Sequence, residues 1–157
     1  MRLEYFQLID RVVDLKLSER TIRCEATVPA ESTIFEGHFP GYPLMPGVLL
    51  VEAMAQTSGW LIVALNRFER MPFLAAVKEA KLRSFVKPGE ILIVEARLAH
   101  DGSGYAMTEA NIKCNGKLVC DAALTLRVLD FPNLEMSKRM RDVAARIGLN
   151  AEAPTDG

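Results

Sequence analysis

The sequence has few residues that bind metals or form disulfides. Its 157 residues include three cysteines and two histidines. None of them forms a CxxC pair or another spacing typical of metal ligands. Three cysteines cannot all pair with one another. We therefore expect a reduced, cytoplasmic protein without a structural metal.

A basic excess and a signal peptide are also missing. The formal net charge is −1, whereas proteins that bind nucleic acid usually carry a basic surface, so no nucleic-acid partner is predicted. The first residues, MRLEYFQLID, lack the basic start and the long apolar stretch of a signal peptide. We expect a short amphipathic helix there.

The longest apolar stretch, residues 48–65, is interrupted by Glu52, Gln56 and the polar or small residues 57–59. Such interruptions argue against a membrane span and favour a helix in the core of the protein. Pro46 suits the first turn of this helix, because its missing N–H costs nothing there. Apolar residues continue around every face until Asn66, so other structure must enclose the helix.

Strand patterns surround this helix. In TIRCEATV, residues 21–28, apolar residues alternate with polar ones, which predicts a half-buried strand. Four strand-length segments follow the helix: FLAAVKEAKL, EILIVEARL, YAMTEANIKC and KLVCDAALTLRVL. Turn residues separate them, and Asn115-Gly116 is typical of a type I′ hairpin. We expect an antiparallel meander, although the alternation does not decide which face of the last hairpin is buried.

The chain is therefore predicted to be an α+β protein, in which a curved antiparallel sheet wraps around one long central helix. Residues 1–130 should form this domain. A helical period from residue 133 to residue 149, with Gly148 as a stop signal, predicts a C-terminal helical extension over 131–149. We expect a disordered tail at 150–157.

The segment EGHFPGYPLMPGVLLVEAMAQ, residues 36–56, holds the candidate site. Three prolines and three glycines between Gly37 and Gly47 leave the loop around His38 little freedom. Glu52 lies on an apolar helix, where desolvation favours the neutral acid, which can donate a proton. Alternatively, Glu52 is simply satisfied by a hydrogen bond from Gln56, one helical turn later. The free N–H groups at the helix start suit an oxygen that gains negative charge.

This segment resembles the signature of the β-hydroxyacyl-acyl-carrier-protein dehydratases of type II fatty-acid synthesis, the FabZ group of the hot-dog fold. HFPG, P-x-MPGV and VEAMAQ all occur at the family spacing, and FLAAVKEAKLRSFVKPGEILIVEARL resembles the second half of these enzymes. The glutamate favours this group over relatives that also isomerise the double bond and carry aspartate. The resemblance covers roughly residues 1–129.

The resemblance implies a role for each site residue. His38 would remove the α-proton, Glu52 would help protonate the departing β-hydroxyl, the Gly47 N–H would bind the thioester oxygen and Gln56 would support the carboxylate. No metal or redox cofactor is implied. In the family, the histidine and the glutamate come from different chains, so we expect a homodimer or a trimer of dimers.

The implied partner is an acyl carrier protein, which is strongly acidic. A local basic patch could bind it, and the sequence KEAKLRSFVK supplies Lys78, Lys81, Arg83 and Lys87. The alternative is that these lysines only protect an exposed strand edge. A second candidate is the basic cluster of the C-terminal helix: Lys138, Arg139, Arg141 and Arg146.

The chain also departs from the family pattern. Leu82 stands where many members have an aromatic residue, Lys78 where an acidic residue is usual, and the chain after Phe131 is longer than in compact members. The acyl-chain length therefore stays open, and a specialised lipid substrate is conceivable. Two other functions compete with dehydration: a hot-dog thioesterase and a non-catalytic acyl-binding subunit. The presence of both His38 and Glu52 favours the dehydratase.

Overall fold

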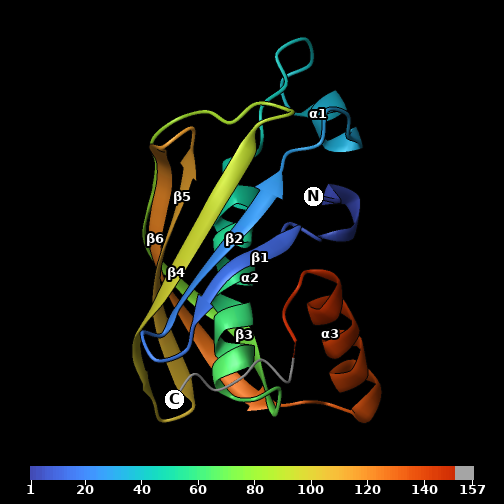
Figure 1. Cartoon of the computed structure of the whole chain (residues 1–157). Helices are drawn as coiled ribbons and strands as arrows, with labels where there is room; N and C mark the ends of the chain where they lie inside the picture. The colour runs from blue at the N-terminus through green and yellow to red at the C-terminus, as the bar shows by residue number, and fades with distance from the viewer. Residues whose placement is uncertain (151–157) are drawn as a thin grey trace.

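The computed structural model describes residues 1–150 and shows one six-stranded sheet curved around the long helix α2, Gly47–Leu65 (Figure 1). All neighbouring strands are antiparallel, in the order β1-β2-β4-β5-β6-β3. The strands are β1 (Arg11–Lys16), β2 (Thr21–Thr27), β3 (Arg70–Leu82), β4 (Ile91–Gly102), β5 (Tyr105–Cys114) and β6 (Lys117–Asp130). The predicted α+β hot-dog architecture and the meander β4-β5-β6 are confirmed, while β3 crosses to the far edge beside β6.

One face of helix α2 packs against the sheet and forms the centre of the core. Pro46 is its N-cap residue, and Met54 and Leu61 are fully buried. By length and mean hydropathy, 1.7, the helix could cross a membrane, but more than half of its residues are buried inside this fold. The opposite face lines a cavity, and its residues are half-buried or buried apart from Val48 in the first turn, which is 74% exposed. The prediction that other structure encloses α2 therefore holds for all of the helix beyond its first turn.

The structure decides which face of the last hairpin is buried. On β5, Ala106, Thr108 and Ala110 point into the core, and on β6 Leu124 and Leu126 do the same. The β5–β6 turn has left-handed backbone at its two central residues, with φ 51° at Asn115 and 77° at Gly116. Both values fit the predicted type I′ turn, because this turn needs positive φ at both positions.

The predicted N-terminal amphipathic helix is wrong. Only Leu3–Tyr5 forms a 3-10 turn, η1, and the chain then reverses so that Arg2 and Gln7 exchange backbone hydrogen bonds. So short a segment cannot sustain a helix on propensity alone. Its backbone is instead used to bind α2.

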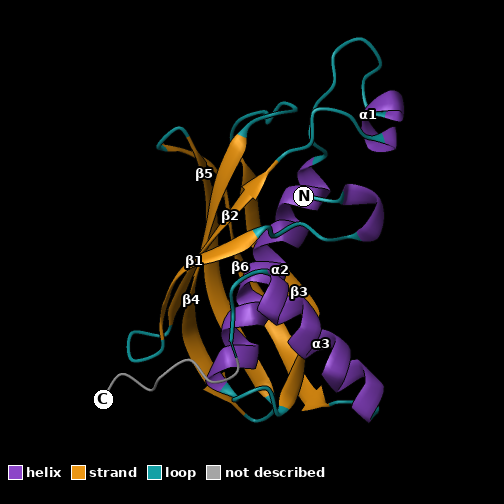
Figure 2. Cartoon of the chain, turned by 45° about the vertical axis from the view of Figure 1, so that its right-hand side comes forward, coloured by secondary structure: helices purple, strands orange, loops and turns teal. Residues whose placement is uncertain are grey.

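Two further helices flank α2. The short helix α1, Thr33–Gly37, precedes the candidate site and was not predicted. The predicted C-terminal helix is confirmed as α3, Leu134–Arg146, with an N-cap bond from the Met136 N–H to the Asn133 side chain. Helix α3 lies alongside α2 (Figure 2). The division into a domain at 1–130 and an extension stays a prediction, and the expected disordered tail lies, except for Asn150, outside the described residues.

Candidate active site

The loop between α1 and α2 is held in place by its backbone. The Tyr42 N–H donates to the Phe39 carbonyl, 2.8 Å, and the Met45 N–H donates to the Val86 carbonyl, 2.8 Å. Phe39 has a left-handed backbone, φ 60°, directly after His38. Left-handed backbone at a non-glycine residue is unfavourable and persists only where the surroundings enforce it. These two bonds and this backbone conformation define where the loop places His38.

The hydrogen bond of His38 determines which nitrogen can act as a base. Its Nδ1 lies 2.9 Å from the Leu44 carbonyl oxygen, which can only accept a hydrogen bond. In the neutral ring, Nδ1 therefore carries the proton and donates it to Leu44. The lone pair lies on Nε2, which is the form that a histidine general base requires.

The start of α2 offers unpaired N–H groups. Within the described chain, no acceptor binds the N–H of Gly47 or of Val48. The helix dipole adds partial positive charge at this end. A Cβ added at Gly47 would overlap a methyl group of Leu82. A larger side chain at Gly47 would therefore have to displace Leu82.

Glu52 is held by Gln56, one turn further along α2. The Gln56 Nε2 donates to Glu52 Oε1 at 3.1 Å, as the spacing of the two residues predicted. Glu52 is half-buried rather than enclosed. Its second oxygen has no hydrogen-bond partner among the described residues, so it is free to act on a bound molecule. Both sequence hypotheses are thus compatible with one geometry: Glu52 is satisfied on one oxygen and available on the other.

The N-terminal segment fixes Gln56 from the other side. The Leu8 N–H donates to Gln56 Oε1 at 3.1 Å, and Gln56 Nε2 donates to the Phe6 carbonyl at 2.8 Å. These two backbone groups determine the orientation of the amide, because one can only donate and the other can only accept. Sequence reasoning missed this role of residues 6–8, since nothing in their composition points to a residue some fifty positions away.

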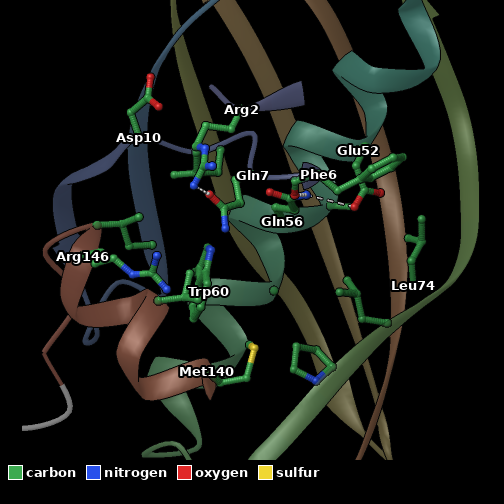
Figure 3. Close-up of a pocket in the computed structure, with 17 residues that line it drawn as sticks. Arg2, Phe6, Gln7, Asp10, Glu52, Gln56, Trp60, Leu74, Met140 and Arg146 are labelled. Atoms are coloured by element: carbon green, nitrogen blue, oxygen red, sulfur yellow. Dashed lines mark hydrogen bonds between the residues drawn. The ribbon is translucent and has the colours of Figure 1, made fainter. Parts of the chain in front are cut away.

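Glu52 and Gln56 line a cavity of about 570 Å³ between α2, α3, β3 and the N-terminal segment (Figure 3). Its volume lies within the range of small-molecule sites. His38 does not line this cavity, and no contact joins it to Glu52 within the described chain. Within one chain, His38 and Glu52 therefore lie apart from each other.

The cysteines are not candidates for a nucleophile. All three are free and buried. Burial raises the pKa of Cys24 and of Cys120 to about 12, so their thiolates are scarce near neutral pH. Among the described residues, no group of three or more metal-ligating side chains could hold a metal ion.

The four basic residues predicted to bind a carrier protein lie in different settings. Lys78 and Lys81 are exposed on the edge strand β3. Arg83 forms an ion pair with Asp121 at 2.7 Å. Lys87 lies 5.9 Å from the centre of the Tyr42 ring, beside the His38 loop. Of the four, Lys87 is the one that lies over a side chain of the His38 loop.

A curved antiparallel sheet around one long helix defines a hot-dog protein. A histidine in the loop before this helix and an anchored glutamate on it are the candidate site residues. A model of the FabA-like domain matches residues 2–123. The chain belongs to this family.

Curated relatives agree. The chain is 33% identical over 138 residues to the 3-hydroxyacyl-acyl-carrier-protein dehydratase FabZ of Francisella tularensis subsp. novicida, covering 80% of this chain and 85% of that protein. It is 37% identical over 130 residues to the bifunctional enzyme LpxC/FabZ of Chlorobaculum tepidum. That match covers 82% of this chain and only 28% of the longer bifunctional protein.

Solved structures support the fold. The dehydratase heterocomplex ApeI:P from Xenorhabdus doucetiae aligns with a TM-score of 0.64 at 17% identity, covering 86% of this chain and 89% of that chain. A hypothetical thioesterase from Streptococcus pneumoniae, solved with coenzyme A, aligns with a TM-score of 0.62 at 14% identity, covering 78% and 88%. At these identities, the likeness establishes the hot-dog fold and does not distinguish the two activities.

Proposed function

We propose that the chain is a 3-hydroxyacyl-acyl-carrier-protein dehydratase. It converts a (3R)-3-hydroxyacyl chain to the trans-2-enoyl chain in type II fatty-acid synthesis or in a specialised lipid pathway. The observation that carries this function is the state of two side chains, one in the loop before α2 and one on α2. His38 has a free Nε2 because Nδ1 is bound, and Glu52 has one anchored oxygen and one free oxygen.

The reaction is an elimination of water. His38 Nε2 takes the proton from the α-carbon, and the C–H electrons pass onto the thioester carbonyl, whose oxygen gains negative charge. These electrons then form the new double bond as the bond between the β-carbon and the hydroxyl breaks. Glu52 gives its proton to the departing hydroxyl, which leaves as water. The Gly47 N–H binds the thioester oxygen while that oxygen carries negative charge. No electrons are transferred to or from the substrate, so the reaction needs no redox cofactor.

A complete site requires a second copy of the chain. His38 and Glu52 do not touch within one chain, and the edge strand β3 exposes apolar residues that include Phe73, Leu74 and Val77, each about 41% exposed. An exposed apolar edge strand is a surface for pairing with another chain. We infer a homodimer in which His38 of one chain faces Glu52 of its partner, and the larger trimer of dimers is an extension of this unit.

The proposed partner is an acidic acyl carrier protein in the cytoplasm. Lys87 is the residue that we favour for contact with it, because it lies beside the loop of His38. Lys78 and Lys81 occupy the edge strand that a second copy would use, and Arg83 is already paired with Asp121. We therefore regard these three residues as weaker candidates than Lys87 for contact with the carrier protein.

The function is tested by hydration of a crotonyl thioester, the reverse reaction, measured as loss of the enoyl absorbance. Release of free thiol is measured in parallel. A dehydratase consumes the enoyl group without releasing thiol. Release of thiol without loss of the double bond would identify a thioesterase instead, and neither signal would favour a non-catalytic acyl-binding subunit.

The shared site is tested by mixing two inactive variants, His38→Ala and Glu52→Gln, after reversible dissociation. A mixed dimer has one site with both substitutions and one site with neither. We therefore expect activity to return toward half of the wild-type value in verified mixed dimers. Failure to recover any activity would show that both residues act within one chain.

A further inference from the structure

Helix α3 lies outside the part of the chain that matches the FabA-like family, which ends at residue 123. It nevertheless supplies Met140, Val143 and Ile147 to the same cavity that Glu52 and Gln56 line. We propose that α3 is an acyl-chain specificity element: its inward side chains form the wall that limits the length of the acyl chain. This inference rests on the proposed function and names the part of the chain that selects its substrate.

The position of Glu52 decides what occupies the cavity. The carbon that loses its hydroxyl must lie at Glu52, so the rest of the acyl chain has to leave from that point. Figure 3 shows Met140 from α3 and Trp60 from α2 turned toward the same space beyond Gln56. The lining there is mostly apolar and includes Leu126 from β6. An apolar wall next to the reacting carbon suits a hydrocarbon chain.

The C-terminal half of helix α3 is anchored to the rest of the fold. The Val12 N–H donates to the Ile147 carbonyl at 2.7 Å, which joins the end of α3 to strand β1. Ala144 is 1% exposed and Ile147 is 6% exposed. The Arg141 guanidinium lies 5.2 Å from the centre of the buried Phe68 ring, at the end of α2. A wall that is anchored in this way limits a ligand by size, because moving it would disrupt these packing contacts.

The experiment measures kcat/KM on 3-hydroxyacyl thioesters of increasing chain length with three variants of α3. Val143→Trp fills the cavity, Met140→Ala enlarges it, and Ala145→Trp adds the same bulk at an exposed position of α3 as the matched control. An apolar pocket discriminates by about 10-fold or more against a methylene that it excludes. We therefore expect the kcat/KM of Val143→Trp for long substrates to fall by at least about 10-fold. Its loss on the four-carbon substrate should be much smaller, because the shortest chain extends least far into the cavity. Met140→Ala should shift the preference toward longer chains, and Ala145→Trp should behave as wild type.

Two outcomes would overturn the proposal. Equal loss at every chain length in Val143→Trp, with a changed oligomeric state, would show that a second copy fills the cavity. Unchanged chain-length preference in both Val143→Trp and Met140→Ala would show that the acyl chain lies elsewhere.

A binding assay separates this proposal from the proposed function. Calorimetry with acyl-pantetheine amides of the same chain lengths measures the affinity of the pocket for the acyl chain directly, because it needs no turnover. If the wild type has no dehydratase activity but Val143→Trp still weakens long amides selectively, the catalytic assignment fails and the acyl wall stands. If the enzyme is active and no variant alters the binding of the amides, the acyl wall fails alone.

Discussion

Met54 and Glu52 lie two residues apart on α2 but have different surroundings. Met54 is fully buried in the core, where its neighbours hold it by packing. Glu52 is half-buried on the face that lines the cavity, where one hydrogen bond to Gln56 holds it. The buried face thus joins the helix to the sheet, and the cavity face leaves the second oxygen of Glu52 without a partner among the described residues. Substitutions on the two faces should therefore affect different measurements.

The largest effect should come from Glu52→Gln. The amide has nearly the same shape and can still accept the bond from Gln56, but it cannot supply the proton. A general acid typically contributes about 10²- to 10⁴-fold, so kcat/KM should fall by that factor. Thermal unfolding should change little, because the side chain is half-exposed. A folded Glu52→Gln enzyme with wild-type turnover would remove Glu52 from the mechanism.

Met54→Ala should give the opposite result. Truncating a fully buried methionine leaves a cavity and typically costs about 2 to 5 kcal/mol of unfolding free energy. Activity per folded molecule should stay close to wild type, because Met54 does not line the cavity of the site. Urea unfolding and turnover at a temperature below the transition test the two parts separately. An activity loss at full folding would mean that the two faces are coupled.

The parts of the fold that follow from local sequence patterns are the parts that the sequence predicts well. Period-two alternation in TIRCEATV and the Asn115-Gly116 turn are local signals, and the structure has the strand and the turn in these places. The position of β3 beside β6 depends on pairing between distant segments, so no local pattern could predict it. The Glu52–Gln56 bond follows from helical spacing, whereas the bonds of Gln56 to Phe6 and Leu8 depend on how the N-terminal segment folds back.

Gln56→Leu tests whether that segment positions the acid. Leucine keeps the size of the side chain but loses the bonds to Glu52, Phe6 and Leu8. The unpaired Leu8 N–H is part-buried, so we expect a cost of about 1 kcal/mol in stability. A misplaced catalytic group can lower the rate by up to about 10²-fold. Positioning predicts a fall in kcat with KM nearly unchanged, whereas a merely structural role would lower stability and leave kcat per folded molecule intact.

The smallest effect concerns Glu4, which joins the N-terminal segment to α1, the helix before His38. Its Oε1 accepts bonds from the Ser32 hydroxyl, 2.6 Å, and the Thr33 N–H, 3.1 Å. The hydrogen bond from Ser32 is the main reason that the pKa of Glu4 falls from 4.5 to about 2. Because the folded pKa lies below the unfolded value, this carboxylate stabilises the protein fully above about pH 4.5, and the contribution is lost as the pH falls through about 2.

Glu4→Gln should therefore lower Tm slightly at pH 7, and the difference from wild type should shrink as the pH falls from about 4.5 toward 2. Glu36→Gln is the matched control, since Glu36 is an exposed carboxylate on α1 with no hydrogen-bond or ion-pair partner among residues 1–150. It should show no such difference. Glu4 is fully exposed, so the effect on Tm is small. A constant Tm difference between Glu4→Gln and wild type from pH 7 to pH 2 would show that the charge of Glu4 does not hold α1. His38 is the residue that directly follows α1. The effect of Glu4→Gln on kcat/KM at neutral pH therefore shows how far the position of His38 depends on the contact between Glu4 and α1.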